Sequence, residues 1–360
     1  MRSVLYEIAP GGDIEIILKE PDTQEIDPKI VSYRPRPILE SDDSSGSEDE
    51  EDGNGFYDEF TSMMDDLNMQ FYDSSDPSSS DKKDVEIRMR VSSSHLALAS
   101  PFFKREIETF QEENSSAVPN LVLDGLDSKA LAIALNVIHG RQRQVPRKVD
   151  LPFLTTVASF AETFGCVEAL QFTAEVWHAA LYEKEPLNKY CLMWLYSSWV
   201  FSWSDSFSEM LRVVSMQYEG PEHFQLNNLP LKNILKKVDR MRIALIKKLI
   251  SDLGDLKEEL SREDGCPDGE SKECTALALG CLMRGMRSMA VMRPPVTAPY
   301  HGYSLNRMLK VIEGFPQLSA SYHETSPDFW ETCTVLSRME PVMRRVTTNM
   351  KNLNLSHFRS

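Results

Sequence analysis

Aromatic and long aliphatic side chains recur at near-helical spacing within an acidic stretch of this chain. The apolar members are Phe56, Phe60, Met63, Met64, Leu67 and Phe71, and the acids among them are Asp58, Glu59, Asp65 and Asp66. An amphipathic helix of this kind can place its apolar side chains in a groove on another protein while its acids stay in water. The spacing fits a segment that folds on binding through Phe56, Phe60 and Leu67. A solvated spacer without a partner is the alternative.

The rest of the chain offers little catalytic or metal chemistry. It has no phosphate-binding glycine loop, no Gly-x-Ser-x-Gly elbow, no His-Glu-x-x-His and no kinase signature set. Cys266, Cys274 and Cys281 are spaced eight and seven residues apart, without the close cysteine pairs of structural zinc sites. We therefore predict that the protein is not an enzyme and has no catalytic residue, cofactor or metal site.

The negative charge of the protein is concentrated in one segment. The formal net charge is −16, and residues 41–81 contain 14 Asp and Glu but no Lys or Arg, which leaves −2 for the rest of the chain. A segment with low hydrophobicity and dense like charge cannot offset the entropy cost of ordering. We therefore predict a disordered acidic insert over residues 41–83.

Strand patterns flank this insert. Residues 13–19 alternate isoleucine with acid before an Ile-Ile-Leu run, and residues 85–91 alternate apolar and charged side chains. Residues 118–125 have the pattern of another short strand. We therefore expect the insert to interrupt a small α+β unit that spans residues 1–182.

Helix signals follow the second of these strands. Ser100 and Pro101 suit the N-cap and first position of one helix, and Asp127 or Ser128 and then Asp150 suit the caps of two more. From about Leu187 the pattern is helical throughout, which predicts an all-α domain over residues 187–350. One long helix, residues 231–260, has its apolar residues on one side and is either a bundle helix or an association surface. Its other side carries basic residues: Lys232, Lys236, Lys237, Arg240, Lys247 and Lys248.

The compartment is expected to be intracellular, either cytoplasm or nucleus. Six cysteines are sparse for 360 residues, which favours reduced thiols over a disulfide framework. The N-terminus lacks a basic start followed by an apolar run, and the longest nearly uncharged apolar run is well short of the roughly 20 residues of a spanning helix. We therefore predict no membrane segment. Basic residues elsewhere are scattered and not aligned with exposed aromatics, so we predict no nucleic-acid binding.

The ordered set of elements over residues 85–182 resembles the BTB/POZ domain, and in particular the fungal BTB-domain proteins. The stretch from Leu96 to Phe103 (LALASPFF) looks like the "L…SPYF" signature of that family. Residues 121–125 (LVLDG) look like its "I.L.D" strand, and residues 138–140 (IHG) look like its "YTG"-like helix end. The resemblance implies a fold made to bind other proteins.

Some members of this family contact a cullin scaffold through a hydrophobic-x-Glu element after the SPYF helix. Phe110, Gln111 and Glu112 fit that element in place and type. The resemblance implies that Phe110 and Glu112 bind the scaffold; core packing of Phe110 with a solvated Glu112 is the alternative. Only about a dozen residues precede the first predicted strand, too few for the extra N-terminal helix of many dimeric members. A monomer is expected, with a homodimer left open.

We therefore expect a protein–protein interaction module that acts as an adaptor or scaffold. Its partners are expected to be other proteins: the resemblance implies either an adaptor that presents a client to a cullin-type ubiquitin ligase or a scaffold in nuclear regulation. The alternative function is a transcription-linked regulator that binds partners through the acidic-hydrophobic insert.

Overall fold

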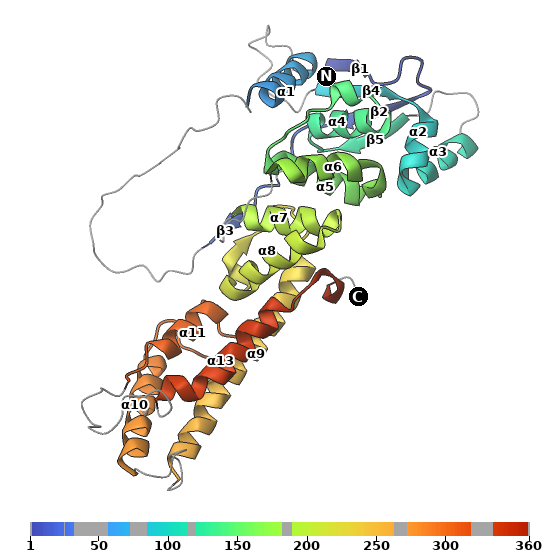
Figure 1. Cartoon of the computed structure of the whole chain (residues 1–360). Helices are drawn as coiled ribbons and strands as arrows, with labels where there is room; N and C mark the ends of the chain where they lie inside the picture. The colour runs from blue at the N-terminus through green and yellow to red at the C-terminus, as the bar shows by residue number, and fades with distance from the viewer. Residues whose placement is uncertain are drawn as a thin grey trace, which may run out of the picture.

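The structure is a computed structural model that describes residues 2–24, 26–31, 57–72, 85–113, 120–181, 189–262, 272–317 and 334–358. The protein is elongated, with a mixed α/β unit at one end and a helical half at the other (Figure 1). The two parts meet where helix α5 of the first packs against helix α7 of the second.

The sheet of the α/β unit joins strands from both sides of the insert. Its strands are β1 (Arg2–Glu7), β2 (Ile14–Lys19), β4 (Val85–Val91) and β5 (Asn120–Asp124), in the order β1-β4-β2-β5. Strand β2 is antiparallel to β4, with Ile14 opposite Val91 and Leu18 opposite Ile87. Strand β1 is parallel to β4, and β5 is parallel to β2. The strands predicted on either side of the insert are confirmed and lie in one folded unit as expected; their direct pairing comes from the structure.

Alternation along β2 and β4 gives the sheet one apolar face and one polar face. Because successive side chains of a strand point to opposite faces, every second residue enters the core. The buried side chains are Ile14, Ile16, Leu18, Ile87, Met89 and Val91. Helices cover this face, and the charged residues between these positions lie on the other face.

Five helices follow strand β4 in the α/β unit. They are α2 (Ser93–Ala99), α3 (Pro101–Glu113), α4 (Ser128–Ile138), α5 (Leu151–Thr163) and α6 (Val167–Leu181). The predicted caps are confirmed: Asp127 accepts a hydrogen bond from the backbone N–H of Ala130 at 2.7 Å, and Asp150 accepts one from Phe153 at 2.8 Å. These bonds satisfy N–H groups that have no partner within their own helix.

Part of the predicted disordered insert is a packed helix. Helix α1 (Tyr57–Phe71) lies against β1 and α4, and its residues Met64, Leu67 and Phe71 are buried. The expectation of disorder over 41–83 is therefore wrong for residues 57–72, because their apolar side chains bury enough surface to fix the helix on its own domain. Residues 32–56 and 73–84 of the predicted insert lie outside the described residues.

The second half consists mainly of helices. They are α7 (Lys189–Val200), α8 (Ser204–Gln217), α9 (Lys232–Leu260), α10 (Lys272–Ala290), α11 (Leu305–Glu313) and α13 (Val335–Lys351). Helix α9 contacts α8, α10, α11 and α13, and it extends from the middle of the molecule to its far end (Figure 1). No helix of the described ranges is both long and apolar enough to span a membrane.

A short strand pair connects the N-terminal segment to the helical half. Strand β3 (Lys29–Ile30) is antiparallel to β6 (Phe224–Gln225), and the Asn227 side-chain amide donates to the carbonyl of Asp27 at 2.8 Å. The predicted domain boundaries assign residues 26–31 to the first unit, and only helices were predicted after residue 187. The pair of β3 and β6 was therefore missed. Two-residue strands cannot be predicted from the alternation of apolar and polar residues, because they are too short to show it.

Candidate protein-interaction surface

The start of helix α3 is fixed by a fully buried serine. The Oγ of Ser100 accepts a hydrogen bond from the backbone N–H of Phe103 at 3.1 Å and donates one to the carbonyl of Phe164. The ring of Phe103 stacks on that of Phe164 with centroids 5.3 Å apart. Both contacts join α3 to the end of α5, so the later turns of α3 extend from a rigid base.

The two residues predicted to contact a cullin lie near the C-terminal end of α3. Phe103 and Ile107 face the core, Phe110 is half-buried, and Glu112 is exposed. Residues two apart on a helix point about 200° apart. A partner that contacts both Phe110 and Glu112 must therefore enclose this end of the helix.

The apolar residues predicted to bind a partner from the insert contact the protein's own domain. Leu67 is buried, and the ring of Phe60 meets Phe153 of α5 edge to face, with centroids 5.3 Å apart. Phe71 is fully buried and meets the ring of Tyr6 at 5.6 Å. Phe56 lies outside the described residues.

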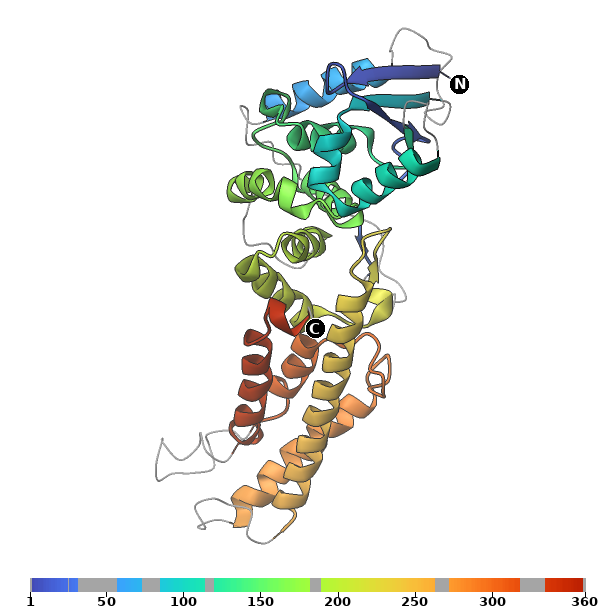
Figure 2. The ribbon, with the colours of Figure 1, turned by 90° about the vertical axis from the view of Figure 1, so that its right-hand side faces the viewer.

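The predicted interaction residues form two separate sites. Helix α1, which carries Phe60 and Leu67, lies on the flank of the α/β unit, whereas α3, which carries Phe110 and Glu112, lies on the opposite side (Figure 1). The view turned by 90° also separates the two helices (Figure 2).

The C-terminal end of α1 is tied to the loop ahead of α4. Tyr72 donates its hydroxyl hydrogen to Asp22, and the other carboxylate oxygen of Asp22 accepts from the backbone N–H of Ser128. Burial, together with the nearby negative charge of Asp22, raises the pKa of the Tyr72 phenol, which therefore stays protonated as a donor.

A cavity of about 360 Å³ lies between α1, β1 and the short helix η2 (Gln142–Gln144). Its lining includes the acids Glu7, Glu59 and Asp66 and one cation, Arg141. The Arg141 guanidinium already donates to the backbone carbonyls of Glu7 and Ile8, at 2.9 and 2.7 Å. The lining is mostly polar and its one cation is already engaged, so we assign the cavity no ligand.

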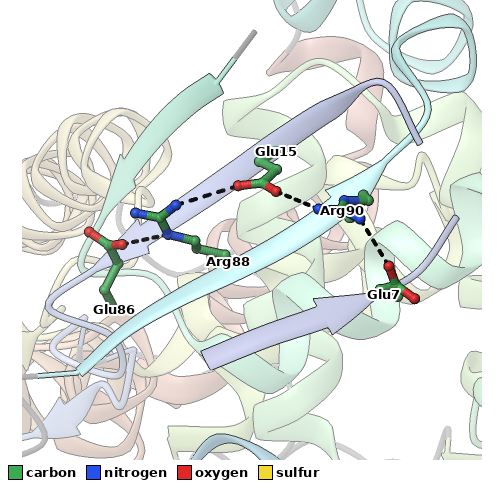
Figure 3. Close-up of polar contacts among 5 residues, drawn as sticks. All are labelled: Glu7, Glu15, Glu86, Arg88 and Arg90. Atoms are coloured by element: carbon green, nitrogen blue, oxygen red, sulfur yellow. Dashed lines mark hydrogen bonds and ion pairs between the residues drawn. The ribbon is translucent and has the colours of Figure 1, made fainter. Parts of the chain in front are cut away.

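The polar face of the sheet carries a network of ion pairs across three strands (Figure 3). Glu15 of β2 lies between two arginines of β4: its oxygens are 3.7 Å from Arg88 Nη1 and 3.1 Å from Arg90 Nη2. Arg88 also contacts Glu86 at 2.7 Å, and Arg90 contacts Glu7 at 3.1 Å. Hydrogen bonding to Glu86, with the charges of Glu86 and Glu15, raises the pKa of Arg88. The charges of this face are largely paired with one another, so we assign the face no ligand.

The sequence gives only a partial signal for this network. The alternation of charged residues along 13–19 and 85–91 indicates a polar sheet face. The register that places Glu15 opposite Arg90, and the presence of β1 beside β4, come only from the structure.

Compared with known proteins, the chain matches no family model, no curated protein and no solved structure.

Proposed function

We propose that the protein is an adaptor for protein–protein interaction, whose BTB/POZ-like α/β unit binds a cullin-type scaffold at the end of α3. The helical half would then hold the client that the adaptor presents to the ubiquitin ligase. The observation that carries this proposal is the placement of Phe110 and Glu112 at a solvent-facing helix end above a rigid core.

The order and pairing of the elements support the proposal. An antiparallel pair (β2 and β4) is followed by the helix pair α2–α3, then by β5 parallel to β2, and then by α4, α5 and α6. Of the stretches that resemble the BTB/POZ family, Ser100 caps α3, and residues 121–124 lie in β5.

The chemistry of the α3 end suits a protein partner. A half-exposed aromatic ring supplies apolar area that a partner can bury, and an exposed carboxylate can accept hydrogen bonds at the rim. Truncation of such an anchor typically weakens binding by more than about 1 kcal/mol.

The experiment is affinity capture of a cullin by the full-length chain from cells. Replacement of both Phe110 and Glu112 by Ala is expected to abolish capture, whereas Gln111→Ala, between them on the same helix, is expected to leave it unchanged. Equal capture by the double variant and the parent protein would overturn the cullin role.

A second candidate, the transcription-linked regulator, is favoured by the amphipathic character of α1. Glu59, Asp65 and Asp66 are exposed while Met64 and Leu67 are buried, as in helices that dock on a partner. This function requires α1 to leave its packed position. It predicts that an isolated segment of residues 41–81 activates a reporter, and that replacement of Phe56, Phe60 and Leu67 by Ala abolishes the activation.

A further inference from the structure

Four cations share the solvent-facing side of helix α9. Lys232, Lys236, Arg240 and Lys247 are all exposed. The opposite side of the helix is buried, at residues that include Leu235, Val238, Arg242, Ile246 and Leu249. At 100° per residue, Lys236, Arg240 and Lys247 lie within about 40° of one another, and the rise of 1.5 Å per residue makes the row about 22 Å long. We call these four residues the α9 basic row.

No described residue neutralises the α9 basic row. The ion pairs of α9 within the described ranges use other cations: Arg242 pairs with Asp239, and Lys248 pairs with Asp252. Lys232 with Lys236, and Lys236 with Arg240, are instead like-charged pairs four residues apart. Each such pair destabilises a helix by a few tenths of a kcal/mol. The row therefore carries repulsion that an anionic ligand would relieve.

The surroundings of the row do not oppose its attraction for anions. Residues 187–360 contain 22 Lys and Arg against 19 Asp and Glu, a net charge of +3, whereas the whole chain is at −16. The helical half is therefore slightly basic and does not repel an acidic ligand, and the attraction comes mainly from the row itself.

We propose that the α9 basic row binds an acidic peptide segment of a partner protein. An extended segment of about seven residues spans the row at roughly 3.3 Å per residue. The row ends at the distal turns of α9, where Asp255, Glu258 and Glu259 reverse the charge, and this limits the length of the bound segment. Helix α9 has no aromatic residue on which bases could stack, which favours a peptide over single-stranded nucleic acid.

The acidic residues 41–55 of the chain itself have the chemistry to compete for the row. The backbone N–H of Val31 donates to the carbonyl of His223 at 2.7 Å, so Val31 lies beside the helical half. The inference concerns the helical half only and does not rest on the cullin role of α3, so the two proposals can fail separately.

The test measures binding of a fluorescein-labelled peptide of Glu-Asp-Ser repeats to the full-length protein by anisotropy at low salt. We expect saturable binding, weakened at least about tenfold by Lys236→Glu with Lys247→Glu, and no binding of the uncharged Gln-Asn-Ser peptide. The matched control is Arg284→Glu with Arg287→Glu, which changes the net charge equally at exposed positions of α10; it should cost less than about threefold. The Lys236→Glu change creates attractive pairs with Lys232 and Arg240, so thermal unfolding should show no loss of stability.

Three outcomes would overturn the proposal. Equal loss in the α10 control would show that only the overall charge matters. Tighter binding of a single-stranded oligonucleotide with the same dependence on Lys236 and Lys247 would assign the row to nucleic acid. Peptide binding that appears only after deletion of residues 41–55 would show that the chain's own acidic segment occupies the row.

Discussion

Tyr72 donates its hydroxyl hydrogen to a carboxylate oxygen of Asp22 across 2.8 Å, and the two residues are fifty positions apart in the chain. Because the other Asp22 oxygen accepts from the backbone of Ser128, this contact joins the end of α1 to the start of α4. Helix α1 is thereby part of the folded unit, although it lies within an acidic segment.

Truncation of the most buried side chain of α1 should destabilise the protein. Phe71 is fully buried beside Tyr6, so Phe71→Ala leaves a cavity and is expected to lower the free energy of unfolding by about 3 kcal/mol. Met69→Ala, on the exposed side of the same helix, should cost less than about 0.5 kcal/mol. Urea unfolding measures both, and equal effects would indicate that α1 does not pack as described.

Replacement of the fully buried guanidinium of Arg242 should also destabilise the protein. It donates to the carbonyls of Pro299, Tyr300 and Tyr303 and to the Asp239 carboxylate, which fixes the loop between α10 and α11 on α9. A lysine ammonium cannot reproduce this planar fork, so Arg242→Lys should cost about 3 kcal/mol in urea unfolding. The exposed Arg240→Lys is the control, and a comparable loss there would contradict the assignment.

Local signals predicted the strands and helix starts of the α/β unit, because alternation and capping chemistry act within a few residues. The sequence also placed β2 and β4 in one folded unit, whereas their direct pairing and register come only from the structure. Strand β1 was missed, since its exposed Ser3 and Leu5 give an edge strand little apolar contrast. Arg242 was missed for a different reason: a single cation among the core positions of α9 acquires its role only from the distant carbonyls of residues 299–303.

The sequence predicted the helix that carries Phe110 and Glu112 of the candidate site, because the helical spacing of apolar residues is a local signal. The same reasoning could not place α1. Whether an amphipathic helix buries its apolar side on its own domain or on a partner depends on Tyr6, Phe153 and other residues distant in sequence.

Stability should decrease as the pH falls below about 6.5. Burial lowers the pKa of His139, His178 and His223, the last to about 4. The pKa of each histidine is lower in the folded protein than its value near 6.5 in the unfolded chain. Between these two values the unfolded chain binds more protons, so the free energy of unfolding decreases as the pH drops. For His223 this loss reaches up to about 3 kcal/mol near pH 4.

The contribution of His223 can be isolated with His223→Asn. The Nδ1 atom of His223 accepts from the backbone N–H of Glu219 at 3.1 Å, and an asparagine oxygen can accept in its place without titrating. Thermal unfolding measured from pH 7.5 to 4.5 should show a smaller decrease for the variant than for the parent protein. Parallel curves would show that His223 does not contribute to the pH dependence.

The ion pairs on the sheet face should contribute little to stability. Arg88 and Arg90 are partly exposed, so Glu15→Gln is expected to cost less than about 1 kcal/mol, and 0.5 M salt should reduce the difference. Salt-dependent urea unfolding provides the measurement. A loss above about 2 kcal/mol that salt does not change would show that the network is a major part of the fold.

The adaptor role is tested most directly by titration of a purified cullin scaffold into the purified full-length protein, with calorimetry as the readout. We expect one-to-one binding that is weakened at least about tenfold, or 1.4 kcal/mol, when Phe110 and Glu112 are both replaced by Ala, and unchanged by Gln111→Ala. Absence of binding by the parent protein, or equal affinity of the double variant, would contradict the proposed function.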